Sequence, residues 1–235
     1  MSLGQSRGAS TVTDISGRLV FEVQGSACAG YSVSRRFVSH IASEQSVTTN
    51  DQRLTTFEEP DGSRYRFISR SYHGETLRES VNGLATRRDN AVHVDLSEPQ
   101  DSELLLPSDV LFPFQHLKKL IAAAHNGETM VSANVFEGAD AGQTVYEASA
   151  AIGLPGSGAV LPVIADIEPL SDLPRWHVDI AYFDHSEGLA ELPEYEFSYT
   201  LLSNGVSTDV FLDYGDFTLR GELVSLELLD TPACE

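Results

Sequence analysis

Hydrophobic and polar residues alternate along most of the chain. Leu19, Phe21 and Val23 share one parity, whereas Arg18 and Glu22 take the other. A period of two predicts a half-buried β-strand. The same pattern predicts further strands over residues 31–42, 46–57, 63–72, 76–81, 84–88, 91–96, 129–136 and 144–152.

Turn-forming dipeptides separate the predicted strands. Asn82-Gly83 and Asp89-Asn90 are two such signals. The clearest hairpin is predicted around Asn204-Gly205, a dipeptide that favours a two-residue type I′ turn. Counting outward from that turn places Leu201 opposite Thr208, which leaves one side of the ribbon almost wholly apolar.

One segment has helical periodicity. Within residues 113–125, Phe114, Leu117, Leu120 and Ile121 recur with the spacing of an α-helix. Proline suits the first turn of a helix, and the Asn-Gly pair that follows the segment supplies its end. The apolar stripe of this helix predicts that it covers a sheet as a lid or plug.

Two later segments are less regular. Residues 153–175 are rich in Gly, Pro and acidic residues and predict a loop with short turns. A strand is predicted from Asp216 to Leu228, with a bulge between Gly221 and Ser225 where the apolar parity switches.

The bulk composition fits one folded domain. The chain has 235 residues, of which 41% are hydrophobic and 21% charged, and all-β domains commonly reach this size. We expect a single domain over residues 17–235, preceded by a vector-derived start and a flexible segment over residues 1–16. A sheet of so many hairpins must curl, pack on itself or close.

The net charge excludes one class of partner. At −20, the chain repels the phosphates that dominate nucleic-acid affinity. Residues 1–100 hold 11 Arg and 12 Asp or Glu, whereas residues 101–235 hold 4 basic and 23 acidic residues. The acidic second half is interpreted as a solvated surface, with a docking surface for a cationic partner as the alternative.

The sequence predicts an exported protein that does not span a membrane. No stretch approaches the ~20 consecutive apolar residues needed to cross a bilayer. The only cysteines are Cys28 and Cys234, and no cluster of His or Cys at zinc-ligand spacing surrounds either. One disulfide in an oxidising compartment is the simplest interpretation, and two buried thiols are the alternative.

Candidate reactive groups are sparse, and we predict no catalytic residue, metal site or cofactor. Ser157 lies in a glycine-rich loop that lacks the spacing of a nucleophile elbow. His177 and Asp179 share one strand face, with Asp184 and His185 beyond them. A metal site there is the alternative to a solvated polar face, which we favour.

Two charged pairs remain as hypotheses. Glu58-Glu59 would serve acid–base chemistry if burial raised the pKa of one carboxyl group, although such pairs arise by chance in an acidic chain. Arg64 and Arg66 share one strand face, where an anionic lipid headgroup is a conceivable contact. A solvated outer face is the alternative interpretation.

Both ends of the chain resemble the envelope integrity protein B (EipB-like) family. The first similar segments are residues 17–23 (GRLVFEV), 25–31 (GSACAGY) and 36–38 (RFV). The last are residues 196–199 (EFSY), 204–206 (NGV) and 213–219 (DYGDFTL), with Gly221 and Cys234. The middle of the chain is similar only in pattern.

The resemblance implies a periplasmic protein with a disulfide that maps onto Cys28 and Cys234. It also implies a β-spiral, a strongly curled antiparallel sheet or half-open barrel like those of periplasmic lipoprotein carriers, and a role in cell envelope integrity without an established reaction. We therefore expect a non-enzymatic protein that holds a lipid or lipoprotein acyl chain in an apolar cavity. The residues predicted to line it are Phe114, Leu117, Leu120, Ile121, Phe197, Tyr199, Leu212 and Leu219.

The sequence is also consistent with two other functions. The protein would be a scaffold whose acidic surface binds other periplasmic envelope proteins, or an acid–base hydrolase of envelope polymers. The hydrolase needs a pair of carboxylates in a cleft.

Overall fold

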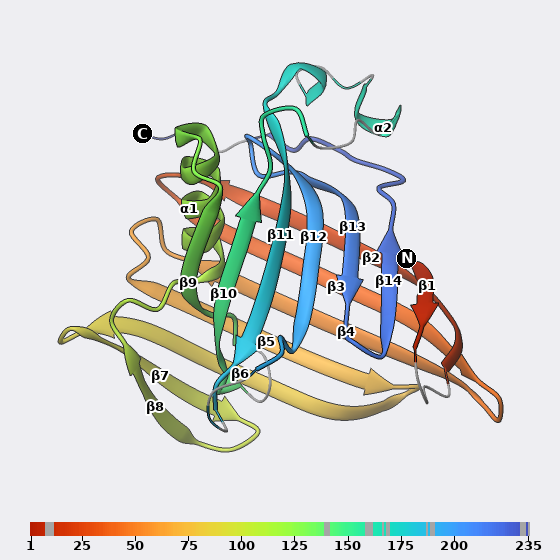
Figure 1. Ribbon diagram of the computed structural model, residues 1–235. Coiled ribbons are helices and arrows are strands. Elements are labelled where there is room, and N and C mark those ends of the chain that lie inside the picture. Colours follow the sequence, from red (N-terminus) through yellow and green to blue (C-terminus); the bar gives the residue numbers. More distant parts are fainter. Residues whose placement is uncertain are drawn as a thin grey trace. The chain divides into compact units, whose positions relative to one another are not determined.

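The protein is a mainly antiparallel β protein with one main helix, as the sequence predicted (Figure 1). The fold is described from a computed structural model, which covers residues 1–7, 12–138, 142–157, 162–165, 167, 170–186, 188, 191–230 and 234. The hydrogen-bonding order of the strands is open, from β8 at one end to β9 at the other. In the described part of the chain, no helix is both long enough and apolar enough to cross a membrane.

The chain divides into two compact units, and the single domain expected from the sequence stays a prediction. The meander unit comprises residues 12–115, 134–145 and 229–235. The hairpin unit comprises residues 1–11, 116–133 and 146–228.

Strands of the meander unit follow one another in sequence order, and each pairs antiparallel with the next (Figure 1). A turn was predicted at Asp89-Asn90, and both residues have positive φ, at 52° and 58°, so this turn is a two-residue turn of type I′. The strands are β2 (Val12–Ser26), β3 (Gly30–Ser43), β4 (Val47–Glu58), β5 (Arg64–His73), β6 (Thr76–Arg88), β7 (Ala91–Glu98) and β8 (Ser102–Pro107).

The turn predicted at Asn82-Gly83 is wrong, because both residues lie inside β6. Gly83 is directly opposite Phe67 on β5 and Leu96 on β7. A Cβ atom at Gly83 would come within 2.8 Å of Leu96 Cδ2. The glycine therefore provides space for two core side chains rather than a turn.

The core of the meander unit is apolar and rich in aromatic rings. Tyr65 and Phe67 on β5 stack with their ring centroids 5.6 Å apart, and Phe136 meets Phe67 edge to face at 5.5 Å. Such pairs add to the free energy gained from burying their area. The buried members of this core are Tyr65, Phe67, Val81, Ala85, Val92, Val94, Leu96, Val110, Phe112 and Phe136.

The hairpin unit has its own strand order, β1-β14-β13-β12-β11-β10-β9. Rings of Tyr146, Tyr182 and Tyr195 pack against one another within it. Its strands are β1 (Ser2–Ser6), β9 (Met130–Phe136), β10 (Val145–Ile152), β11 (Arg175–Asp184), β12 (Tyr195–Leu202), β13 (Ser207–Asp213) and β14 (Phe217–Gly221). Strand β9 extends into the meander unit over residues 134–136, and β10 does so only at Val145.

The start of the chain is more ordered than predicted. Residues 1–16 were expected to be flexible, but Ser2 pairs with Arg220 and Ser6 with Phe217, so β1 is a strand beside β14. The end of β14 also differs, because the predicted strand stops at Gly221. Residues 222–230 have no regular structure. Leu223 and Leu226 instead pack against a small buried cluster of Ile164, Leu170 and Leu202.

The predicted register of the β12–β13 hairpin is wrong by one residue next to the turn. Leu201 lies opposite Ser207 rather than Thr208. The amide of Leu202 donates a 2.8 Å hydrogen bond to the Val206 carbonyl, so the turn has three residues instead of two. Asp209 then adopts a φ of 54°, in the irregular stretch where the register shifts.

Helix α1 spans Pro113–Asn126 and matches the predicted segment. Gly127, with a φ of 74°, ends it. The amide of Gly127 donates to Ala124 O at 3.2 Å, and that of Glu128 donates to Ala123 O at 3.0 Å, which is a Schellman cap. The predicted loop over residues 153–175 contains only the short helices α2 (Pro162–Ala165) and η2 (Leu170–Asp172) in its described part.

Candidate functional site

Cross-strand register sorts the side chains of the meander unit onto two faces. Val23 on β2 is opposite Val33 on β3, Val33 is opposite Thr56 on β4, and Thr56 is opposite Phe67 on β5. Directly opposed residues project to the same side of a sheet. The face that carries the buried core at Phe67, here called the core face, therefore continues without interruption to β2.

On β2 this apolar face is exposed. Leu19, Phe21 and Val23 are 40%, 58% and 37% exposed, and we call them the apolar strip. Phe37, directly opposite Leu19 on β3, is half-buried and extends the strip sideways. Adjacent exposed apolar side chains on one sheet face are typical of a ligand or partner contact.

A single cation interrupts the apolar surroundings. Arg35 on β3 is directly opposite Phe21 on β2 and Leu54 on β4. Val33 and Phe37, two positions away along β3, project to the same face. The Arg35 side chain is exposed, and no hydrogen bond or ion pair joins it to any residue in the described part of the chain.

The core face is closed at its other end by the beginning of α1. Glu58, which is 1% exposed, accepts hydrogen bonds from the amides of Phe114 at 2.8 Å and Gln115 at 3.1 Å. The Phe114 ring stacks on Tyr31 with their centroids 4.4 Å apart. Glu58 is therefore the capping residue of the helix.

Arg87 holds the segment that precedes the helix. Its guanidinium donates to Val110 O at 2.9 Å and to Gln115 Oε1 at 3.2 Å, and it lies over the Phe112 ring. The Gln115 side chain in turn accepts from the Phe112 amide at 3.1 Å. This segment is thus tied to the sheet by charge-assisted hydrogen bonds.

The predicted cavity residues fall into separate groups. Phe197, Leu212 and Leu219 occupy directly opposed positions on β12, β13 and β14 and share one face. The Phe197 and Tyr199 rings are 4.7 Å apart. These residues belong to the hairpin unit, as do Leu117, Leu120 and Ile121 of α1, whereas Phe114 packs in the meander unit. That they line a ligand cavity stays a prediction.

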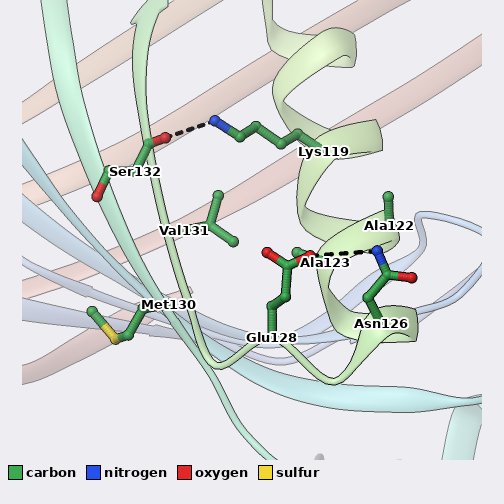
Figure 2. A pocket seen from close by; sticks show the side chains of 8 residues that line it. All are labelled: Lys119, Ala122, Ala123, Asn126, Glu128, Met130, Val131 and Ser132. Carbon is green, nitrogen blue, oxygen red and sulfur yellow. Dashed lines mark hydrogen bonds between the residues drawn. The ribbon is translucent and has the colours of Figure 1, made fainter.

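A cleft of about 370 Å³ lies between α1 and β9, and other residues line it (Figure 2). Lys119 Nζ donates a 2.7 Å hydrogen bond to the Ser132 carbonyl across the cleft. Its charged group is therefore already engaged. The lining residues are Lys119, Ala122, Ala123, Asn126, Glu128, Met130, Val131 and Ser132.

The second face of the meander sheet, here called the arginine face, is basic. Arg36, Arg53 and Arg70 occupy directly opposed positions on β3, β4 and β5. Arg64 and Arg66 project from β5 to the same face and are exposed, as predicted from their spacing. Their predicted contact with an anion stays a prediction.

Asp51 compensates part of this positive charge. Its carboxylate accepts from Arg36 Nη2 at 2.8 Å and from Arg53 Nη2 at 2.7 Å. The hydrogen bonds from both guanidinium groups hold the pKa of the Asp51 carboxyl well below its usual range. Arg53 also lies over the Tyr72 ring, 4.8 Å from its centroid.

The residues considered for metal binding form pairs rather than a cluster. His177 Nε2 is 3.3 Å from Asp179 Oδ1, and His185 Nε2 is 3.1 Å from Glu147 Oε2. No group of three or more His, Cys, Asp or Glu suited to a metal ion occurs among the residues described. Ser157 Oγ accepts from the backbone amide of His177 at 3.0 Å, so this serine is bonded to the histidine main chain rather than to its ring.

Cys28 and Cys234 form a disulfide, as predicted, with their Cα atoms 5.8 Å apart. Both belong to the meander unit. Cys28 lies in the turn between β2 and β3, and the Ser26 hydroxyl is 3.1 Å from its sulfur. The bridge therefore fastens a segment near residue 234 to the strand that carries the apolar strip.

Sequence reasoning missed the site in two ways. It recognised the alternation of Leu19, Phe21 and Val23 but took that parity as buried. It also did not single out Arg35, although this arginine shares its parity with Val33 and Phe37 and so breaks an apolar face. A charged residue at an apolar position of the strand pattern was the signal by which Arg35 could have been found.

Comparison with known proteins gives consistent results. The model of the EipB-like family matches residues 1–230. The cell envelope integrity protein EipB of Brucella abortus (strain 2308) is 33% identical over 228 residues, which cover 94% of this chain and 79% of that protein. A crystal structure of a β-barrel-like protein of the DUF1849 domain of unknown function, also from Brucella abortus, superposes with a TM-score of 0.91 at 32% identity and covers 97% of this chain and 94% of that one. Because the family model matches nearly the whole chain and the Brucella protein is similar over most of its own length, the chain belongs to the EipB-like family.

Proposed function

We propose that the protein is a non-enzymatic, periplasmic component of the cell envelope that holds the acyl chain of a lipid or lipoprotein on its apolar strip. The exposure of Leu19, Phe21 and Val23 on the core face carries this proposal. An acyl chain laid along these side chains would remove their apolar surface from water, which is favourable by about 25 cal/mol per Å². The name of the Brucella relative supports the role in the envelope, and the disulfide supports an oxidising compartment.

Native mass spectrometry of protein purified from the periplasm tests the proposal. We expect the wild type to carry masses of bound lipid, and we expect the double variant Leu19→Ser and Phe21→Ser to lose them. Val20→Ser is the matched control, because Val20 is 51% exposed on the opposite face of the same strand. A wild type that shows only the apo mass, under conditions that preserve lipid on known carriers, would contradict the proposal.

Partner binding is the second candidate function, and the arginine face favours it. Three guanidinium groups in one cross-strand row repel one another, and Asp51 compensates only part of their charge. An anionic envelope partner would relieve this repulsion. We expect such a partner to be retained by the wild type at low salt but released at high salt, and to be lost in Arg70→Glu. If the partner stays bound at high salt and also binds Arg70→Glu, this candidate function is excluded.

The carboxylate pair considered for hydrolysis has another role. The Glu58 carboxylate accepts two backbone hydrogen bonds from α1. Glu58 is the last residue of β4, whereas Glu59 lies outside the strand. This arrangement supports a structural rather than a catalytic role for Glu58.

A further inference from the structure

Arg35 differs from the other arginines of β2–β5, since it alone projects to the core face. Arg18, Arg36, Arg53, Arg64, Arg66 and Arg70 project to the arginine face. Arg35 is instead surrounded by Phe21, Leu54, Val33 and Phe37, which are apolar.

No carboxylate forms a salt bridge with Arg35 in the described part of the chain, and its charge acts on the buried Tyr65 hydroxyl, which Glu58 and Glu137 also influence. Glu58 is the nearest acidic position on the core face of β4, four residues along the strand from Leu54. Four residues of strand span about 13 Å. The Glu58 carboxylate already accepts hydrogen bonds from Phe114 and Gln115.

Covering the strip with a neutral alkyl chain would be costly at this one place. The chain would remove water from the Arg35 guanidinium without replacing its hydrogen bonds, and an unpaired charge loses free energy when it is desolvated. An occupant with an anionic end avoids this cost. A guanidinium offers two parallel N–H donors that match the oxygen atoms of a carboxylate or phosphate.

We propose that Arg35 is the headgroup contact of an anionic amphiphile, whose carboxylate or phosphate pairs with the guanidinium while its acyl chain lies on the apolar strip. This inference rests on the proposed function and specifies its ligand class. The methylene groups of the Arg35 side chain add to the apolar floor, and its charged end stands above that floor. Selectivity for an anionic headgroup is the consequence.

Binding of four twelve-carbon probes below their micelle concentrations tests this inference. The probes are dodecanoate, dodecyl phosphate, dodecanol and dodecyltrimethylammonium, titrated into the purified, disulfide-bonded protein. We expect the two anions to bind at least about tenfold more tightly than dodecanol, the ratio that corresponds to one charge-assisted hydrogen bond. Whichever anion binds more tightly identifies a fatty acid or a phosphate-bearing lipid as the source.

Arg35→Gln should remove the preference for anions and leave the affinity for dodecanol unchanged. Arg35→Lys should retain part of the preference, because it keeps the charge but loses the two-donor geometry. Arg18→Gln is the matched control, since Arg18 is an exposed arginine on the opposite face of β2, outside the row of Arg36, Arg53 and Arg70. It should behave like the wild type.

The outcomes separate this inference from the proposed function. Equal binding of dodecanoate and dodecanol by the wild type would overturn the role of Arg35 and leave the acyl-chain function intact. The same holds if Arg35→Gln weakens all four probes equally. Failure of every probe to bind would overturn both.

Discussion

Glu58 Oε2 accepts a 2.8 Å hydrogen bond from the backbone amide of Phe114, the second residue of α1. The two residues are 56 positions apart in the sequence. A carboxylate buried at the end of β4 thus supplies the N-terminal cap of the main helix. The stability of the helix start therefore depends on the position of this strand.

Glu58→Ala should therefore destabilise the protein. The substitution leaves two amide groups at the helix N-terminus without an acceptor, which we expect to cost about 2 kcal/mol of unfolding free energy. Glu58→Gln, which keeps one acceptor oxygen, should cost about half as much. Urea unfolding measures both, with Glu59→Ala as the control expected to stay within about 0.5 kcal/mol of the wild type. Equal stability of Glu58→Ala and Glu59→Ala would exclude the capping role.

Reduction of the disulfide should also destabilise the fold. The bridge joins residues 206 positions apart, and closing a loop of that length lowers the entropy of the unfolded chain by the equivalent of about 5 kcal/mol. We expect the double variant Cys28→Ser and Cys234→Ser to unfold at a lower urea concentration than the wild type. Dithiothreitol should bring the wild type to the midpoint of the variant and leave the variant unchanged. Coincident midpoints before reduction would contradict the expectation.

Asp51→Asn should weaken the meander unit, because it leaves Arg36 and Arg53 beside Arg70 without a compensating carboxylate. Both guanidinium groups are about half exposed, so we expect a loss of only about 1 kcal/mol. Glu22→Gln, on the same face, serves as the control.

The Asp51 substitution also has a pH signature. The depressed pKa of this carboxyl makes its stabilising contribution fully present above its usual pKa and progressively lost as the pH falls below it. The difference in unfolding free energy between the wild type and Asp51→Asn should therefore shrink as the pH falls below about 4. A difference that is constant with pH would show that the ion pairs do not account for it.

His116 should make the protein sensitive to mild acid. This residue is 5% exposed, and its Nε2 atom has no hydrogen-bond partner in the described part of the chain. Burial, and to a smaller extent the nearby charge of Lys119, lowers the pKa of His116 to about 4. Because the unfolded chain takes up this proton at higher pH, stability is lost as the pH falls from about 6.5 towards 4, by roughly 3 kcal/mol in total.

His116→Leu should remove that part of the pH dependence. The comparison is the slope of unfolding free energy between neutral pH and the folded-state pKa, measured for the wild type, His116→Leu and the exposed control His73→Gln. We expect only His116→Leu to flatten the slope. If the three slopes coincide, another group is responsible for the acid sensitivity.

The local pattern predicted most of the strands and α1, because strand alternation and helical spacing are properties of neighbouring residues. It failed at Asn82-Gly83, where the glycine provides space for Phe67 and Leu96, residues of other strands. It also failed at Ser2–Ser6, whose strand depends on pairing with β14. These contacts between distant segments are not encoded in any short window of sequence.

The candidate site shows the same limit. Arg36, Arg53 and Arg70 are 17 residues apart in sequence, so no basic run marks them, and only the register of β3, β4 and β5 brings them into one row. Likewise, alternation indicated that Phe21 belongs to an apolar face but not that this face is uncovered at β2. Exposure depends on where the covering segments end, which the tertiary fold decides.

The disulfide makes the polypeptide between Cys28 and Cys234 a covalent ring, and every strand from β3 to β14 and both α-helices lie within it. A protease that cuts one peptide bond in any loop of this ring opens it without releasing a fragment. The nicked protein would keep its full mass on a non-reducing gel and separate into two pieces only after its sulfurs are reduced. A single cleavage in one loop therefore does not release any part of the protein.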